Sequence, residues 1–328
     1  MTSEAYPRKF VLQRRVSYSH QRSGWNYAMA CLEPLLAQGD DGVLFDSMIE
    51  KNFCRRVQEA EAGGEIPYRR PWVGFVHVPL ELPPWHDPHK SLRHISRLPV
   101  WQRSMPYCQG LLVLSAWLRD QVRQLVDVPV LNLRHPTQVP ETKFTLERYR
   151  NNRQPRVIQI GWWLRRLCSI HELPTRSLRR TLIKPFAEGR DLGRFESVLE
   201  SERLSRSLPP IGEWDVDILP RQPNETYDQL LSENIVFLHL HSASVSNAVI
   251  ECIVRHTPVL VNPLPSLVEY LGESYPFYFR TLEEAAAKAE DLNQVRMAYE
   301  YLAALPKQAL TGDYFCRSLA ESDFYRGL

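Results

Sequence analysis

The chain has 328 residues, of which 44% are hydrophobic and 24% are charged. This composition is typical of a globular protein and excludes an intrinsically disordered one, and the length suffices for two domains with separate cores. The formal net charge of +2 does not indicate a nucleic-acid partner. Arginine pairs such as Arg69-Arg70 suit local anion sites or an acidic membrane surface.

Cysteine spacing and hydropathy narrow the class of protein further. The six cysteines have no CxxC spacing, which argues against a zinc site and against a disulfide framework. No apolar run has the length of a transmembrane helix or the pattern of a signal peptide. We therefore expect a cytoplasmic protein without a bound metal, and peripheral contact with a membrane stays open as an alternative.

The first half of the chain alternates apolar runs with helical patterns. Strands are predicted at 10–12, 42–45, 73–78, 110–114 and 128–133, and helices at 25–36 and 116–125. Ser115 stands where a helix N-cap is expected. Such alternation indicates βαβ units and a parallel sheet. The segment 81–106 is rich in Pro, Trp and His, which predicts an irregular loop that runs over the surface.

A second α/β series follows a polar segment, 140–155, that is interpreted as a linker. Strands are predicted at 157–160, 214–219, 235–240 and 259–262, and helices at 188–207, 225–232, 247–256 and 282–305. The aromatic tail is expected to dock on a folded domain. We predict an N-terminal domain at 1–150, a C-terminal domain at 151–305 and a tail at 306–328 that packs back on the N-terminal domain.

The segment 234–272 (NIVFLHLHSASVSNAVIECIVRHTPVLVNPLPSLVEYLG) carries the most specific pattern. Its first strand ends at a short polar loop, and a helix follows, which is the arrangement that binds phosphates in parallel α/β sheets. Ser244, Ser246 and Asn247 supply donors at that helix N-terminus. Glu251, one turn further, is placed to accept from ribose hydroxyls, and Arg221 follows the preceding strand, where a base edge fits. The alternative is an ordinary capped helix whose glutamate faces solvent.

This segment resembles the donor-binding region of retaining, family 4-like GT-B glycosyltransferases, which use nucleotide sugars. In that family a helix carries a nucleotide-binding glutamate, and a strand and a turn follow it. Glu251 falls on that glutamate, the residues 257–261 (TPVLV) fall on the strand, and Glu269 and Gly272 fall on the turn. Ala243 departs from the pattern, because the family often has a glutamate there that faces the donor sugar.

The resemblance extends in order over most of the chain, but only the C-terminal segment is specific. It implies an α/β fold of the GT-B class, with two Rossmann-like domains facing each other across a cleft. In the family, basic residues at this place bind the donor diphosphate, and Arg165 is the best match to them, followed by Arg166 and Lys184. Without the resemblance, Arg165-Arg166 would be interpreted as a basic pair on the surface. Gly24 falls where these enzymes have a glycine-rich loop, although here the glycine is single.

His77 ends the apolar run VGFVHVP. From the residues alone it is interpreted as a histidine at the edge of a core. The resemblance implies instead that it faces the donor sugar, so His77 and Arg165 are the expected catalytic residues.

The function implied by the resemblance is transfer of a sugar from a UDP- or GDP-sugar to a hydroxyl of a saccharide or glycoconjugate. The expected enzyme is a retaining transferase of the hexosyltransferase type that needs no metal. Two alternatives stay open. One is an inactive GT-B-like binding module, because of Ala243. The other is a glycosyltransferase acting on modified nucleic acid, which the small net charge disfavours. No G-x-S-x-G, Walker, G-x-G-x-x-G or H-E-x-x-H motif points to another chemistry.

Overall fold

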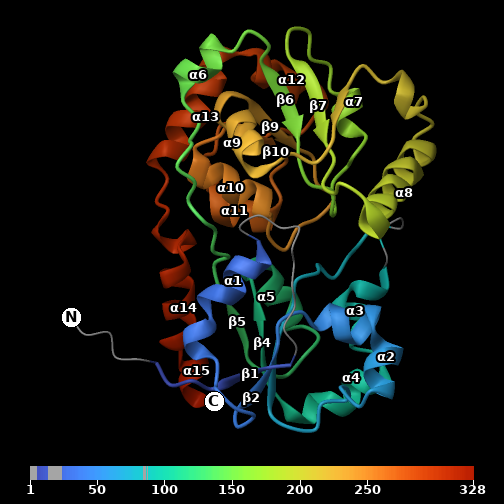
Figure 1. The fold of residues 1–328 in the computed structure, drawn as a ribbon, viewed down its shortest axis with the longest axis vertical. Coiled ribbons are helices and arrows are strands. Elements are labelled where there is room, and N and C mark those ends of the chain that lie inside the picture. The colour runs from blue at the N-terminus through green and yellow to red at the C-terminus, as the bar shows by residue number, and fades with distance from the viewer. Residues whose placement is uncertain (1–5, 14–23, 84–85, 87) are drawn as a thin grey trace. The chain divides into compact units, whose positions relative to one another are not determined.

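The computed structural model describes residues 6–13, 24–83, 86 and 88–328. The chain divides into two compact units, the first comprising residues 1–82, 87–138 and 308–328, and the second residues 83–86 and 139–307. Each unit contains a five-stranded parallel β-sheet with helices packed on it, which confirms the α/β fold class (Figure 1). Within the described residues, no helix is both long enough and apolar enough to span a membrane.

The first sheet follows the chain from edge to edge. Its strands pair in the order β1-β2-β3-β4-β5, all parallel. They are β1 (Phe10–Leu12), β2 (Val43–Asp46), β3 (Trp72–Phe75), β4 (Cys108–Val113) and β5 (Val130–Asn132). The helices of this unit are α1 (Trp25–Cys31), α2 (Val57–Ala62), α3 (Leu92–Ile95), α4 (Pro99–Ser104), α5 (Ala116–Val122), α14 (Gly312–Ala320) and α15 (Asp323–Gly327).

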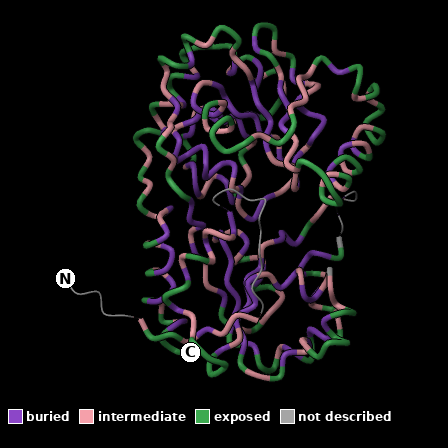
Figure 2. Tube along the Cα trace, in the orientation of Figure 1, coloured by how far each residue is buried: buried purple, intermediate pink, exposed green. Residues whose placement is uncertain are grey.

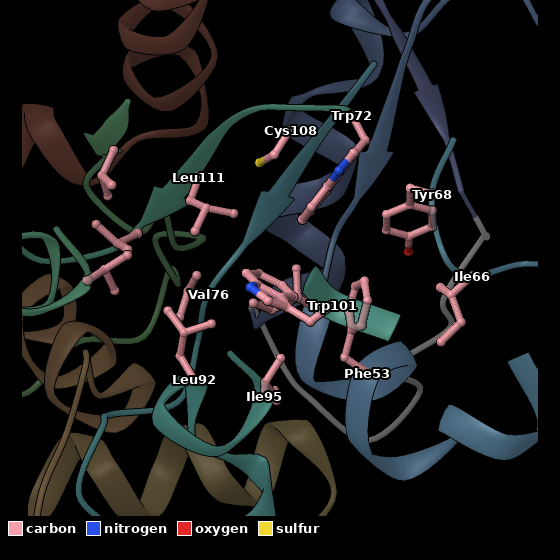
Figure 3. Close-up of a cluster of buried hydrophobic side chains, with 14 of the residues drawn as sticks. Phe53, Ile66, Tyr68, Trp72, Val76, Leu92, Ile95, Trp101, Cys108 and Leu111 are labelled. Atoms are coloured by element: carbon pink, nitrogen blue, oxygen red, sulfur yellow. The ribbon is translucent and has the colours of Figure 1, made fainter. Parts of the chain in front are cut away.

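The core on one face of this sheet is built around aromatic rings (Figure 3). Trp72 of β3 is fully buried against Phe53 and Trp101, with ring centroids 6.1 and 5.6 Å away. Its indole N–H donates to the Ser104 carbonyl at 2.8 Å, so the one polar atom of the ring is satisfied. Because strand side chains alternate between faces, Phe75 lies on the opposite face, where it contacts Trp25 of α1.

The C-terminal helices complete that opposite face. Phe315 of α14 packs against Phe75, and α14 lies directly on α1. Gly312 permits this contact, because a Cβ there would lie 2.5 Å from the Cys31 sulfur. The segment 308–328 is therefore part of the first unit.

The second sheet has the strand order β10-β9-β6-β7-β8, again all parallel. Its strands are β6 (Arg156–Gln159), β7 (Arg179–Ile183), β8 (Asp217–Leu219), β9 (Ile235–Leu238) and β10 (Val259–Val261). Its helices are α6 (Leu146–Asn151), α7 (Ser169–Glu172), α8 (Gly189–Ser205), α9 (Asn224–Glu233), α10 (Asn247–Arg255), α11 (Pro265–Leu271), α12 (Leu282–Glu290) and α13 (Leu292–Ala304). In both units the buried residues concentrate along the strands, as parallel sheets covered on both faces require (Figure 2).

Three expectations need correction. The segment 140–155 is not a plain linker, because it carries α6, whose first turn Thr145 caps. The segment 88–106 is not a surface loop, because α3 and α4 bury Leu92, Ile95 and Trp101 in the first core. Strand β7 is absent from the prediction, because it begins with two arginines; Arg179 ion-pairs with Asp217 of β8 at 2.7 Å.

Candidate functional site

The strand order of the second sheet creates a topological switch point between β6 and β9. The chain runs outward from β6 to β7 and β8, then returns to β9 beside β6 and continues to β10. In open α/β sheets, ligands bind at such a point, outside the carboxyl ends of the strands. The loops that follow β6 and β9 flank this point. They hold four of the residues predicted to bind the donor, namely Arg165, Arg166, Ser244 and Ser246.

These two loops are joined to each other through their backbones. The N–H of Arg166 donates to the His239 carbonyl at 2.7 Å, and the N–H of His241 donates to the Leu164 carbonyl at 2.9 Å. Between these bonds, Arg165 and Leu240 form an antiparallel bridge. The basic loop after β6 and the polar loop after β9 therefore hold each other in a fixed relative position.

Two polar side chains, the buried Glu202 and the half-buried Asn262, anchor this pair of loops. Glu202 of α8 accepts the N–H groups of Leu167 at 2.7 Å and Cys168 at 3.4 Å. Asn262, just after β10, exchanges two hydrogen bonds with the backbone of Leu240, at 2.8 and 3.0 Å. Both loops are consequently preorganised, which lowers the entropic cost of binding a ligand between them.

Arg165 is the central cation of the site and is only 9% exposed. Its Nη1 donates to the Trp163 carbonyl at 2.6 Å and its Nη2 to the Ser246 hydroxyl at 3.3 Å. Its Nε is buried without a hydrogen-bond partner within the described part of the chain. Burial lowers the pKa of Arg165 to about 10, so the guanidinium stays charged at neutral pH. An unsatisfied donor on a buried cation is suited to an anionic ligand.

The N-terminus of α10 adds a second attraction for anions at the same place. First-turn N–H groups have no partner inside a helix, and the Ser246 side chain at the N-cap does not cap them. Its hydroxyl accepts from Arg165 instead. Ser244 is buried in the same loop, and Asn247 begins the helix. The helix dipole and the guanidinium therefore favour one anion site.

Glu251 lies one turn into α10 and is buried in a network of polar side chains. The Tyr227 hydroxyl, from α9, donates to Glu251 Oε2 at 3.0 Å, and Arg255 Nη1 lies 3.6 Å from the same oxygen. Arg255 also pairs with Asp228 at 3.1 Å. The charge of Glu251 raises the pKa of Arg165 against the effect of burial, so the two groups share one electrostatic environment. The solvent-facing alternative for Glu251 is therefore wrong.

Of the remaining predicted residues of this unit, Arg166 lies beside Arg165, and Lys184 and Arg221 lie farther along the same sheet edge. Burial is the main reason that the pKa values of His239 and His241 are lowered, and the charge of Arg166 lowers them further. Lys184 follows β7 and ion-pairs with Glu196 at 2.8 Å. Arg221 is exposed in the loop after β8, two strands from β6.

Two predicted residues belong to the first unit. Gly24 is buried immediately before α1 and has a φ of −86°, so its conformation does not use the left-handed region that favours glycine. His77 lies two residues beyond β3, at the carboxyl edge of the first sheet. Burial lowers the pKa of His77 to about 4, so its imidazole is neutral at physiological pH.

Sequence reasoning missed two residues at the switch point. Tyr227 donates a hydrogen bond to Glu251. The sequence feature that could have identified it is a tyrosine in the first turn of the helix that precedes β9. His239 follows β9, and its Nδ1 lies 2.9 Å from the Ser169 hydroxyl. Burial is the main reason that the pKa of His239 falls to about 4, so it is neutral. The sequence feature that could have identified His239 is a histidine at the end of an apolar run.

A separate cavity of about 710 Å³ lies in the first unit, beside the segment 64–70 that precedes β3. Leu44, Arg69 and Arg103 line it, and Arg103 ion-pairs with Glu61 at 2.7 Å. This cavity contains none of the predicted site residues. In the part of the chain that the structure describes, no three His, Cys, Asp or Glu side chains are grouped to hold a metal ion.

No protein-family model matches the sequence, and no curated protein matches it significantly. Solved structures do match the fold. HepE from Anabaena in complex with UDP and glucose is 13% identical, with a TM-score of 0.60 over 85% of this chain and 77% of HepE. A UDP-forming α,α-trehalose-phosphate synthase from Burkholderia vietnamiensis is 12% identical, with a TM-score of 0.55 over 89% of this chain and 73% of the synthase.

A third match is a variant of S. aureus TarM in complex with fondaparinux, α-GlcNAc-glycerol and UDP. It is 13% identical, with a TM-score of 0.53 over 85% of this chain. This chain covers only 54% of TarM. At these identities the likeness concerns the fold alone. The chain has the GT-B glycosyltransferase fold.

Proposed function

We propose that this protein is a glycosyltransferase that moves a sugar from a UDP-sugar to a hydroxyl group of a saccharide or glycoconjugate. One observation carries the proposal. A buried arginine, Arg165, has an unsatisfied Nε donor within the described residues, beside the uncapped N-terminus of α10 at the switch point. A nucleoside diphosphate has the charge and the acceptor oxygens that this arrangement lacks.

The proposed reaction transfers the sugar from the diphosphate to the acceptor oxygen. The bond between the anomeric carbon and the diphosphate oxygen breaks, and its electron pair stays on the diphosphate. The acceptor oxygen forms the new bond to the anomeric carbon, and the acceptor proton leaves to the departing diphosphate. Arg165 and the α10 dipole stabilise the negative charge that grows on the leaving group, which lowers the barrier more than it lowers the energy of the bound donor. We propose retention at the anomeric carbon and a hexosyl donor.

Glu251 completes the proposed donor site. We propose that its carboxylate, which accepts the Tyr227 hydroxyl at 3.0 Å, also accepts from the ribose hydroxyls. We also propose that His77 contacts the donor sugar. The choice of UDP over GDP is supported by the UDP found with HepE and with TarM and by the UDP-forming reaction of the synthase.

The rival function is a GT-B-like module that binds a sugar nucleotide or a saccharide without transfer. The observation that favours it concerns Ala243, which stands where a sugar-facing glutamate is expected. Ala243 is buried, and its carbonyl accepts a hydrogen bond from the Ser266 hydroxyl. The backbone is therefore fixed there, and no carboxylate comes from that position.

Calorimetric titration with UDP, GDP and UDP-glucose tests the proposal, combined with assays of UDP release over a panel of saccharide acceptors. Arg165→Ala is expected to weaken UDP binding by about 10- to 150-fold, the value of a charge-assisted hydrogen bond. Arg165→Lys is expected to recover little, because an ammonium lacks the planar fork. Arg153→Ala, at an exposed arginine near the start of β6, is the matched control and should bind as wild type does.

Each result decides between the two functions. UDP binding that depends on Arg165, together with acceptor-dependent UDP release, supports the transferase. Binding without product for any acceptor supports the binding module. A wild-type chain that binds neither UDP nor UDP-glucose refutes both the proposed donor and the proposed site.

A further inference from the structure

The imidazole of His77 is held in one orientation and one tautomer. Its ring packs edge-on against Trp25, with centroids 4.3 Å apart. Its Nε2 lies 3.0 Å from the backbone carbonyl of Ser47. A carbonyl oxygen only accepts, so Nε2 must carry the proton and Nδ1 the lone pair. Because burial keeps the ring neutral, this tautomer persists at physiological pH.

The backbone of His77 is held by a buried carboxylate. Glu50 Oε1 accepts the N–H groups of His77 at 2.7 Å and Val78 at 2.8 Å. Glu50 is only 3% exposed, and its Oε2 has no hydrogen-bond partner in the described residues. Burial raises the pKa of Glu50 to about 7. A buried carboxyl group with one unsatisfied oxygen costs stability, so its presence here needs a reason other than stability.

The segment 47–50, which carries Ser47 and Glu50, is held in place by contacts with its neighbours. Asp46, the last residue of β2, accepts the N–H of Met48 at 3.0 Å and the Tyr68 hydroxyl at 2.8 Å. Ile49 packs directly on β3 at Gly74, where a Cβ would lie only 2.5 Å from the isoleucine Cγ2. The residues 47–50, which follow β2, therefore pack against β3. Through Glu50 they also bind the backbone of His77 and Val78, which lie just beyond β3.

We propose that Glu50 is a positioning residue for sugar transfer, which fixes the backbone of His77 and so keeps its imidazole in a single place and tautomer. This proposal rests on the proposed function, in which His77 contacts the donor sugar. The hydrogen bond between Glu50 and His77 is made by the backbone N–H of His77, not by its ring. Its loss is expected to leave donor binding by the second unit unchanged and to slow the chemical step, because small misplacements of a reacting group are costly.

The test compares Glu50→Gln, Glu50→Asp and Glu50→Ala in the full chain, with Glu33→Ala at an exposed glutamate as the control. Glutamine keeps an acceptor oxygen at the same reach, whereas aspartate is one methylene too short and alanine has none. The first readout is the imidazole ¹⁵N spectrum of the ligand-free protein, with the His77 signals assigned by their loss in His77→Gln. The other readouts are kcat and KM with UDP-glucose, and the Kd of UDP.

We expect wild type, E33A and E50Q to show the Nε2-protonated form of His77, and E50A and E50D to show a mixture of tautomers. In E50A we expect kcat to fall by about 10- to 100-fold while KM and the UDP Kd stay unchanged. Aspartate serves as the second variant if the alanine variant does not fold.

A His77 spectrum that is the same in E50A or E50D as in wild type overturns the proposal. So does an E50A enzyme with normal kcat, or a loss of UDP affinity equal to the loss of kcat, which would mean a general structural role. If wild type binds no UDP, the proposed function fails, but the ligand-free spectra still decide whether Glu50 positions the ring.

Discussion

Gly161→Ala is predicted to damage the donor site by displacing Arg165. Gly161 directly follows the apolar run that contains β6 and has a φ of +70°. A Cβ at this position would lie 3.0 Å from Arg165 Nη2 and 3.1 Å from its Cζ and Nε. The glycine therefore has two roles, since it adopts a left-handed conformation and leaves room for the guanidinium.

The two roles have separate magnitudes. A left-handed φ costs an L-residue about 1–2 kcal/mol of folding stability. For a unit of this size that corresponds to a fall in Tm of about 2–8 °C. If the methyl group also moves the guanidinium away from the anion site, UDP affinity should fall by about 10- to 150-fold, the worth of one charge-assisted hydrogen bond.

Gly64→Ala is the matched control. Gly64 also has a φ of +70° and lies in the first unit, and among the described residues other than its chain neighbours no atom lies within 4 Å of the place where its Cβ would be. Thermal unfolding measures the backbone strain in both variants, and calorimetric titration with UDP measures binding. Both variants should lose similar stability, but only Gly161→Ala should lose UDP affinity.

Two outcomes would refute this reasoning. Equal UDP affinities for the two glycine variants would mean that the guanidinium does not depend on the space at Gly161, or that Arg165 does not bind the diphosphate. A loss of UDP affinity in Gly64→Ala would mean that reduced stability alone explains the effect.

Three further predictions follow from single contacts. Tyr227→Phe should weaken UDP binding several-fold, by about 1 kcal/mol, and a double-mutant cycle with Glu251→Gln should show that the two effects are not additive. Ser104→Ala should cost about 1–3 kcal/mol in urea unfolding, because the buried N–H of Tyr68 loses its acceptor at 2.9 Å. Unfolding free energy should fall as the pH drops from about 6.5 to 4, by about 1.4 kcal/mol per pH unit per buried histidine. His135 is one of these, because burial lowers its pKa to about 4 in the folded state, so only the unfolded chain takes up a proton in that range. His135→Gln should flatten this dependence, and an unchanged slope would contradict it.

The sequence alone determined the alternation of strands and helices and the polar loop that becomes the N-terminus of α10. Apolar runs such as 235–238 are recognisable because strands buried on both faces need no polar alternation. The cap at Ser115 is a local hydrogen bond between neighbours in the chain, so it depends on short-range sequence.

Only the tertiary structure decided which of these local features meet. β7 begins with two arginines and forms a strand because its last three residues are buried and because it pairs with β6 on one side and β8 on the other. Three hydrogen bonds join residues that are 24 to 81 positions apart in the chain. They connect Arg165 to Ser246, Tyr227 to Glu251, and the backbone of His77 to Glu50. Such contacts are set by strand order and by the packing of loops at the carboxyl edge of each sheet. No local periodicity encodes them, because their free energy is gained only when distant segments have already been brought together.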